Sequence, residues 1–373
     1  MTAVASSPVS QRRLPFGARL LIGSIVGIVV YFGILLFFQY ISNLGSPDPV
    51  AVQNAFPQAV ATSAQQVGNA LVLGAIYALV ALGYTMVYGI IELINFAHGD
   101  VFMVGTFIGL FFLTSFPAPL DFLGLHLPDS PITEPLVLGA VLVATLAVCM
   151  TVMGAINVTI ERLAYRPLRR APRVAPLITA IGVSLILQNL MQIIVGTGDR
   201  KVPQVVPNEH VMILGASIRV ISLIIFVVAV VLMIGLQLFV SRTRLGRAMR
   251  ATAQDQQAAQ LMGVDLNQTI AMTFLIGGAL AGAAGVFQGQ YFGFVRFDLG
   301  FSSGLKAFTA AVLGGIGNLT GAAVGGFLIA FIEVFAQAVG QARWSQAIVF
   351  VVLIVVLVFR PAGIFGQQIG ERA

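Results

Sequence analysis

Long apolar runs with almost no charged residues constrain this chain more than any other feature of its sequence. A transmembrane helix needs about 20 consecutive, mostly apolar residues. Charged residues make up 9% of the chain, whereas a soluble globular domain contains about 25%. The runs therefore predict an all-α polytopic membrane protein with about ten transmembrane helices. The predicted spans are 20–41, 67–91, 99–116, 136–160, 176–196, 218–240, 269–290, 304–317, 319–338 and 344–359.

Arginine residues beside these runs predict the orientation of the chain. Cytoplasmic connections of membrane proteins carry an excess of Lys and Arg. With ten spans and a cytoplasmic N-terminus, the arginine groups all fall inside, and the 117–135 connection, with Asp121, Asp129 and Glu134 but no Lys or Arg, falls outside. A merged or missed pair of spans would leave this orientation unchanged. The sequence thus predicts two cytoplasmic termini, and the net charge of +6 does not require nucleic-acid binding. The groups are Arg12, Arg13 and Arg19; Arg162, Arg166, Arg169, Arg170 and Arg173; Arg242, Arg244, Arg247 and Arg250; and Arg360 with Arg372.

Two polar interruptions, INFAHGD (94–100) and FDLGFSSG (297–304), lie at matching places in the two halves of the chain. Each follows a long Gly/Ala-rich run and precedes a short one, and such segments are the best sequence pointer to a transport pathway. We therefore expect two inverted five-helix halves with broken helices. Glycines in the apolar runs also permit close helix packing. The pairs with the GxxxG spacing for it are Gly278/Gly282, Gly285/Gly289 and Gly321/Gly325. The candidate residues of the translocation path are Asn95, His98, Gly99, Ser303 and Gly304.

The polar residues of the first interruption favour a helix break over a catalytic site. His98 and Asp100 are two residues apart, so they do not face each other on a helix. We expect Asn95 and His98 to satisfy backbone groups freed at the break, and Glu92 to be an interfacial or subunit-contact residue. Helices starting near Gly99 and Gly304 would point their N-termini at the breaks. Free amides there favour an anionic group, such as an amino acid carboxylate.

The segment SRTRLGRAMRATAQDQQAAQLMGVDLNQ (241–268) predicts a short polar helix outside the membrane. Asp255 is the expected N-cap; alternatively Thr252 is the cap and Asp255 lies at N3. Gly263 has the residue type of a helix-ending C′ position. Such a short helix is unstable alone. It lies either on anionic lipid through its arginines or in a groove of a cytoplasmic motor protein.

The chain lacks the residues for ATP hydrolysis and for metal binding. The phosphate-binding loop requires Gly-Lys followed by Ser or Thr, and neither lysine, Lys201 or Lys306, follows a glycine. One cysteine, Cys149, excludes an intrachain disulfide, and His98, His126 and His210 match no metal spacing. We expect a transport subunit rather than an enzyme, with no bound cofactor, and any ATP and Mg²⁺ used by another polypeptide.

Four segments in the same order resemble the LivH-type permease of bacterial branched-chain amino acid ABC importers. They are GNALVLGAIYALVALGYTMVYGIIELINFAHGD (68–100), ERLAYRPLRRAPRVAPLITAIGVSLILQN (161–189), GRAMRATAQDQQAAQLMG (246–263) and GLKAFTAAVLGGIGNLTGAAVGG (304–326). The resemblance implies inward transport of branched-chain amino acids across the bacterial plasma (inner) membrane. It implies a second related permease, as a heterodimer, two cytoplasmic ATPases and an extracytoplasmic binding protein. Close relatives serve urea and short amides.

The resemblance also implies which residues contact the ATPase. The family's coupling segment corresponds to 246–263, although members often have Asp-Pro where this chain has Asp255-Gln256, which weakens the helix start slightly. The candidate coupling residues are Arg244, Gly246, Arg247, Ala253, Asp255, Ala258 and Gly263.

Shorter family members begin near the equivalent of Gln65, so residues 1–64 form an additional part. The run 20–41 exceeds the hydrophobic region of about 7–15 residues in a signal peptide, so we expect an uncleaved span. The predicted organisation is a cytoplasmic segment, extra span and external linker (1–64), a permease domain (65–359) with its coupling loop (241–268), and a cytoplasmic tail (360–373).

An ion-coupled secondary transporter is the alternative, because inverted repeats and broken helices are typical of those carriers too. Such carriers place carboxylates within the membrane to bind or relay the ion. The runs 67–91, 136–160, 176–196 and 319–338 contain one acidic residue, Glu333. This scarcity favours the ATP-driven importer.

Overall fold

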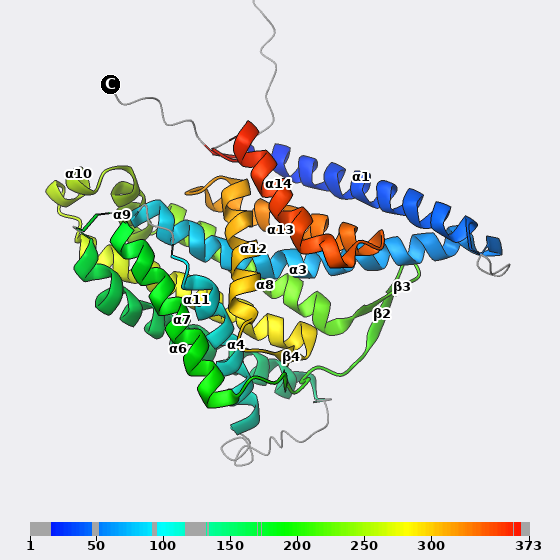
Figure 1. Ribbon diagram of the computed structural model, residues 1–373, viewed down its shortest axis with the longest axis horizontal. Helices are drawn as coiled ribbons and strands as arrows, with labels where there is room; N and C mark the ends of the chain where they lie inside the picture. The colour runs from blue at the N-terminus through cyan, green and yellow to red at the C-terminus, as the bar shows by residue number, and fades with distance from the viewer. Residues whose placement is uncertain are drawn as a thin grey trace, which may run out of the picture. The chain divides into compact units, whose positions relative to one another are not determined.

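The computed structural model describes residues 16–46, 52–91, 95–115, 132, 134–169, 171–172, 174–360 and 362–366, and these residues are mainly helical (Figure 1). They contain eight helices that are long and apolar enough to cross a membrane, and two shorter apolar helices. These ten helices correspond one to one with the predicted spans. The prediction of an all-α polytopic membrane protein is therefore confirmed.

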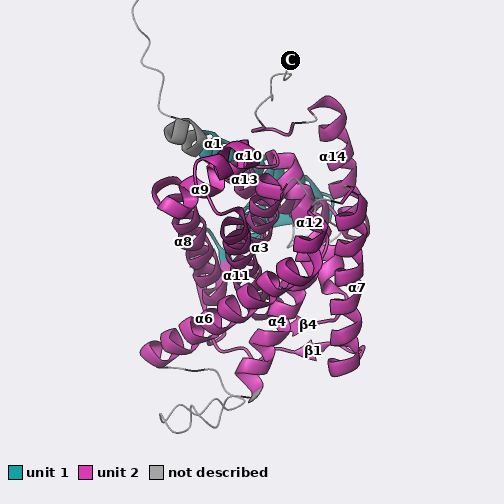
Figure 2. Cartoon of the chain, turned by 90° about the vertical axis from the view of Figure 1, so that its left-hand side faces the viewer, with its two compact units in different colours: residues 1–67, 214–216 teal, residues 68–213, 217–373 magenta. Residues whose placement is uncertain are grey.

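The chain divides into two compact units, coloured separately in Figure 2: residues 1–67 with 214–216, and residues 68–213 with 217–373. The first unit contains α1 (Phe16–Leu44) and the start of α3 (Ala55–Ile91). Within it, the Asn43 side chain donates to the Ala55 carbonyl at 3.2 Å, and the Tyr40 and Phe56 rings meet edge to face. The predicted start of α3 at 67 was wrong. Its upstream part is rich in Ala and Gln, which are polar or small but good helix formers.

The second unit holds the remaining helices and, except for Ala216, the short strands. Its long helices are the rest of α3, α4 (His98–Ser115), α6 (Pro135–Ile160), α7 (Val174–Val195), α8 (Val220–Arg242), α11 (Leu266–Phe292), α12 (Leu299–Gly314), α13 (Leu319–Ala338) and α14 (Ser345–Phe359). Its short helices are η1 (Glu161–Tyr165), η2 (Arg166–Leu168), α9 (Arg244–Gln254), α10 (Gln256–Leu261) and η3 (Ala342–Trp344). Strand β1 (Arg200–Lys201) pairs antiparallel with β4 (Phe294–Val295), and β2 (His210–Ile213) pairs with β3 (Ala216–Arg219).

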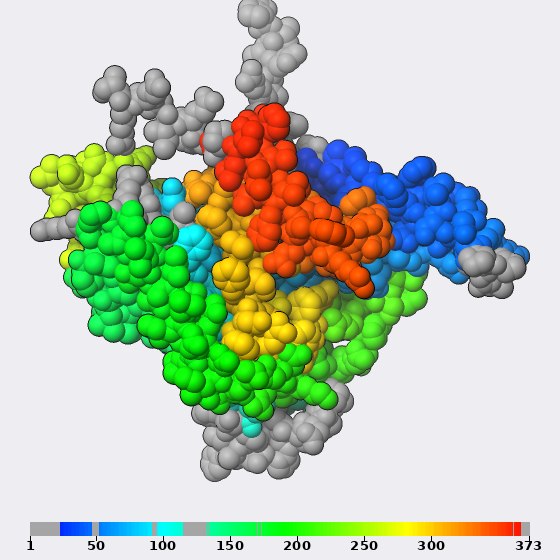
Figure 3. All heavy atoms as spheres, in the orientation of Figure 1, coloured from blue at the N-terminus to red at the C-terminus, as the bar shows by residue number. Residues whose placement is uncertain are grey.

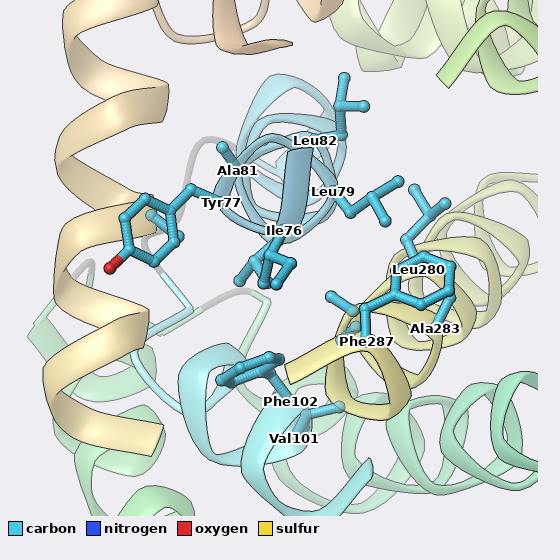
Figure 4. Packing of buried hydrophobic residues seen from close by; sticks show 14 of the residues in the cluster. Ile76, Tyr77, Leu79, Ala81, Leu82, Val101, Phe102, Leu280, Ala283 and Phe287 are labelled. Atoms are coloured by element: carbon cyan, nitrogen blue, oxygen red, sulfur yellow. The ribbon is translucent and has the colours of Figure 1, made fainter. Parts of the chain in front are cut away.

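Glycines bring α11 into close contact with α6 and α4. A Cβ atom on Gly282 would lie 2.7 Å from the Cys149 carbonyl oxygen, and one on Gly285 would lie 2.6 Å from the Thr106 nitrogen. Because lipid supplies no hydrophobic force between helices, close backbone approach at small residues is a main source of their packing energy. These glycines therefore serve helix packing. Figure 4 shows apolar side chains of α3, α4 and α11, among them Ile76, Phe102 and Phe287, filling the space between these helices.

Large apolar side chains remain exposed along the outer faces of several long helices. On α8, Val227, Val231 and Ile234 are each more than half exposed. An apolar surface of this kind is stable in lipid but not in water. This exposure supports insertion of the helices in a membrane.

Candidate translocation path and coupling segment

The first helix break separates α3, which ends at Ile91, from α4, which begins at His98. Glu92 lies outside the described residues. Asn95 and His98 are fully buried. The Tyr165 hydroxyl donates to Asn95 Oδ1 at 2.7 Å, and the His98 ring packs edge to face on the Tyr84 ring. The Asn95 side-chain oxygen thus accepts from a residue of η1. Contrary to the prediction, it does not bind a backbone group freed at the break.

Asp100, in the first turn of α4, is buried and binds two residues of α7. Ser184 Oγ donates to Asp100 Oδ2, and Gln188 Nε2 donates to Asp100 Oδ1 at 2.9 Å. Ser184 and Gln188 were not among the predicted site residues. Their four-residue spacing places both on one face of α7, and this was the available signal.

The second break lies earlier than predicted. Helix α11 ends before Gly293, whose φ of +76° is left-handed, and α12 already begins at Leu299. The placement of Ser303 and Gly304 at the break was therefore wrong, because both lie inside α12 after its first turn. Gly disfavours helices, which suggested a break, but tertiary packing requires this glycine: a Cβ on Gly304 would lie 2.5 Å from the Gly99 Cα.

The starts of α4 and α12 contact each other through equivalent residues. Gly99 and Gly300 are each the second residue of their helix. A Cβ on Gly99 would lie 2.5 Å from the Gly300 carbonyl oxygen, and one on Gly300 would lie 2.9 Å from the Gly99 carbonyl oxygen. Reciprocal contact between equivalent residues is what a two-fold relation produces. The contact supports the predicted repeat and brings the two helix starts together.

A small cavity lies beside the first break. Its volume is about 10 Å³, roughly the room of one water molecule and too little for an amino acid. Two of its lining residues, Thr85 and Asn95, are buried, and neither Thr85 Oγ1 nor Asn95 Nδ2 has a hydrogen-bond partner among the described residues. These groups remain available to a polar molecule. The lining is completed by Tyr84, Tyr88, Phe308, Ala311 and Ile316.

Glu333, the acidic residue noted in the membrane runs, is paired. Its Oε1 accepts from Lys306 Nζ at 2.6 Å, and its Oε2 accepts from the Tyr77 hydroxyl at 2.9 Å. The three residues come from α13, α12 and α3. A carboxylate with both oxygens bonded within the protein is not free to bind a coupling ion.

The polar segment after α8 forms two helices, whereas one was predicted. Thr243 Oγ1 caps α9 by accepting from the Gly246 amide, and Asp255 Oδ1 caps α10 by accepting from the Gln257 and Ala258 amides at 2.8 and 3.0 Å. The predicted Asp255 N-cap is confirmed. The Thr252 alternative was wrong, since Thr252 lies within α9 and donates to the Ala248 carbonyl. Gly263 has a φ of +84°, as expected for a C′ residue.

Most of the predicted coupling residues are exposed on this segment: Arg244, Arg247, Ala253, Asp255, Ala258 and Gly263. Gly246 is buried instead, and a Cβ there would lie 2.6 Å from the Phe239 carbonyl oxygen. Leu261 and Met262, not predicted as site residues, are 89% and 85% exposed. The yellow-green atoms of this segment project at the upper left of Figure 3. A segment that exposes both large apolar side chains and arginines is suited to docking on another protein.

The coupling segment and the arginines that follow α6 share one end of the second unit. Arg169 donates to Asn267 Oδ1 at 2.8 Å, and Asn267 is in the first turn of α11, shortly after α10. Helices α9 and α10 lie at the end opposite to β1 and β4 (Figure 2). The arginine group after α6 and the group around the start of α9 are thus on the same side of the helices. Arg170 and Arg173 of the first of these groups lie outside the described residues.

Comparison with known proteins gives consistent matches. The family model described as the permease component of a branched-chain amino acid transport system matches residues 66–357. The high-affinity branched-chain amino acid transport system permease protein BraD of Pseudomonas aeruginosa is 43% identical over 312 residues, which are 83% of this chain and 97% of BraD. LivH of Escherichia coli K12 is 39% identical over the same shares. A probable LivH of Methanocaldococcus jannaschii is 27% identical over 80% of this chain and 91% of its own. No solved structure matches.

Proposed function

This chain belongs to the permease component family of branched-chain amino acid transport systems, and we propose that it moves branched-chain amino acids inward as one subunit of an ATP-driven importer. The chain is a multi-pass membrane transport subunit. The main observation in support of this mechanism is the exposed pair of helices α9 and α10, whose N-termini are capped by Thr243 and Asp255. This pair presents apolar and basic side chains at one end of the transmembrane helices.

We propose that the exposed face of α9 and α10 docks on a cytoplasmic ATPase that binds ATP and Mg²⁺. Burying a side chain such as Leu261 or Met262 contributes about 1.5–3 kcal/mol, so these two residues supply apolar anchors. The same segment also exposes Arg244, Arg247, Ala253, Asp255, Ala258 and Gly263, while Gly246 permits its close packing on α8. In this arrangement both termini are cytoplasmic, following the positive-inside rule.

The complete importer then contains two ATPases, a second related permease in a heterodimer, and an extracytoplasmic binding protein in the bacterial inner membrane. The binding protein delivers the amino acid from outside. Binding and release of ATP shift the permease pair between outward-open and inward-open states. The cavity beside Asn95 has room for about one water, which fits a path that is closed at this position.

We propose that the two helix starts and the adjacent cavity line this path. Asn95 Nδ2 and Thr85 Oγ1 have no hydrogen-bond partner among the described residues and suit the carboxylate of a passing amino acid. His98 and Gly99 shape the start of α4, while Ser303 and Gly304 belong to the facing part of α12. Asn95→Ala is expected to slow uptake, and an unchanged uptake rate would contradict the assignment of Asn95.

The docking surface is tested with the double variant Leu261→Glu/Met262→Glu. Two carboxylates at this apolar contact should prevent binding of the ATPases and abolish leucine uptake by membrane vesicles, because burial of an unpaired charge is strongly unfavourable. Co-purification of the ATPases with the permease measures docking. Met212→Glu is the control, since Met212 is 68% exposed in β2 and outside the coupling segment. Leucine uptake by the purified chain alone, driven by an ion gradient, would contradict the proposed importer.

A further inference from the structure

The first residue of α10 reaches a distant part of the chain. Gln256 directly follows the N-cap Asp255, and its Nε2 donates a hydrogen bond to the backbone carbonyl of Ile90 at 2.8 Å. Ile90 is the next-to-last residue of α3. The last four carbonyls of a helix have no partner within it. Gln256 therefore caps the end of α3 that leads into the first helix break.

Polar contacts hold the coupling segment at the start of α10 and again after its end. On its far side, Asn267 in the first turn of α11 accepts from Arg169, which also forms an ion pair with the buried Glu161. Within α10 itself, Ala259 is the buried residue. A helix this short is not stable by itself. Its position thus depends on the neighbouring helices and on these contacts.

The contact of Gln256 leads directly to the candidate path. Helix α3 is continuous from Ala55 to Ile91, so a force on its last turn acts on the whole helix. The break that follows contains Asn95, which is held by the Tyr165 hydroxyl at 2.7 Å. Displacement of α10 therefore changes the position of the α3 end relative to Asn95 as long as the hydrogen bond to Ile90 is intact.

We propose that Gln256 is a positioning residue that transmits movement of α10 to the C-terminal end of α3, and so links ATP hydrolysis to opening of the path. This inference rests on the proposed function, in which α9 and α10 dock on the ATPase. Gln256 itself need not contact the ATPase. Its role is to donate a hydrogen bond to Ile90 during the transport cycle.

The test compares two substitutions that differ in their ability to donate. Gln256→Glu preserves the shape of the side chain but places a carboxylate oxygen against the Ile90 carbonyl. Gln256→Lys keeps an N–H donor. The measured quantity is the number of leucine molecules transported per ATP hydrolysed by the complete importer, with its ATPases, second permease and binding protein, in proteoliposomes. We expect Gln256→Glu to lower this ratio about fivefold, the effect of losing one ordinary hydrogen bond. Gln256→Lys should retain it, and complex assembly and ATP hydrolysis should not change.

Gln257→Glu is the matched control. Gln257 is the next residue of α10, and its exposed side chain makes no hydrogen bond to a described residue. Both substitutions place one negative charge in the same helical turn, so their interactions with the helix dipole are alike. An unchanged ratio in Gln256→Glu, or an equal loss in Gln257→Glu, would overturn the proposal.

Two further outcomes separate this inference from the proposed function. If Gln256→Glu releases the ATPases from the complex, the residue serves docking and the positioning role is wrong. If Leu261→Glu/Met262→Glu leaves the ATPases bound, the proposed docking surface itself fails. A lower number of leucine molecules transported per ATP in Gln256→Glu, with the complex still assembled, supports both the positioning role of Gln256 and the proposed importer.

Discussion

Buried polar residues in this chain join helices that are far apart in the sequence. Asp100 of α4 binds Ser184 and Gln188 of α7, and Lys306 of α12 binds Glu333 of α13. In a membrane, an unpaired polar group costs several kcal/mol. Each pair therefore fixes the rotation of one helix relative to another.

The ion pair between Lys306 and Glu333 gives a prediction on stability. The side chains are 14% and 6% exposed, and removing one partner of a buried pair typically destabilises by about 3–5 kcal/mol. Glu333→Leu leaves the Lys306 charge unpaired, so we expect a clear fall in the thermal unfolding temperature of the purified protein in detergent. The double variant Lys306→Met/Glu333→Leu removes both charges, so its unfolding temperature should recover in part; recovery is incomplete because the buried Tyr77 hydroxyl still lacks its Glu333 acceptor.

An exposed ion pair in the same chain serves as control. Arg296 and Asp298 bind each other, but their side chains are 52% and 42% exposed. Such pairs contribute about 0–1 kcal/mol, so Asp298→Leu should change the unfolding temperature little. A double variant at Lys306 and Glu333 that is as unstable as Glu333→Leu would show that the charges are not coupled as described.

At the residue scale, sequence reasoning succeeded where a role depends on near neighbours. The Asp255 N-cap was predictable because it involves the amides of Gln257 and Ala258, two and three residues away. The partners of Asp100 were not, because they lie on another helix and depend on how that helix is rotated. The Gln256 contact with Ile90 has the same origin, since the two residues are 166 positions apart.

At the element scale, helices were predicted more accurately than the breaks between them. Apolar length defines a span, whereas the start of a helix depends on packing as well as on local residue preferences. Ser303 and Gly304 have the composition of a break, yet they continue α12 because Gly304 packs against Gly99. The sequence contained the two matching interruptions but not the contact between the helix starts.

The contact between Gly99 and Gly300 predicts that neither accepts a side chain. An alanine Cβ at either position would lie within 3 Å of the opposite carbonyl oxygen, closer than normal packing allows, so the helices must separate. Overpacking of this kind typically costs about 1–3 kcal/mol. We expect Gly99→Ala and Gly300→Ala each to lower the thermal unfolding temperature and the rate of leucine uptake.

Glycines with open surroundings provide the comparison. Outside the adjoining turns of its own helix, no atom of the described residues lies within 4 Å of a Cβ built on Gly182 of α7 or Gly235 of α8. Ala is also the better helix former by about 1 kcal/mol. Gly182→Ala and Gly235→Ala should therefore leave uptake intact and keep or raise the unfolding temperature. Equal behaviour of all four variants would contradict close packing of the two helix starts.

At the scale of the whole molecule, the two compact units differ in their relation to the family. The family model begins at residue 66, close to the boundary at residue 67 between the units. BraD and LivH are each matched over 97% of their length. The residues before 66 therefore lie outside the matched family model.

The orientation of the permease does not depend on the residues before 66 alone. Arg162, Arg166 and Arg169 follow α6. Arg242 is the last residue of α8, and Arg244, Arg247 and Arg250 follow it. The bias of Lys and Arg among short connections sets the orientation of a membrane protein. These later groups remain when the N-terminal region is removed, so we expect the other spans to insert in the same direction.

The last prediction concerns α1, which lies before the matched region and is not needed for the later arginine groups. Deletion of residues 2–53 removes α1, whose most apolar window is only 6% buried in the described structure, and leaves the matched region and both arginine groups intact. Since few of its side chains are buried by the protein, we expect the shortened chain to assemble with its ATPases and to transport leucine at a rate within about twofold of the full chain, well under 1 kcal/mol in activation free energy. Co-purification and vesicle uptake measure this, with Leu261→Glu/Met262→Glu as the inactive control. A shortened chain that assembles but fails to transport would instead place α1 in the transport cycle.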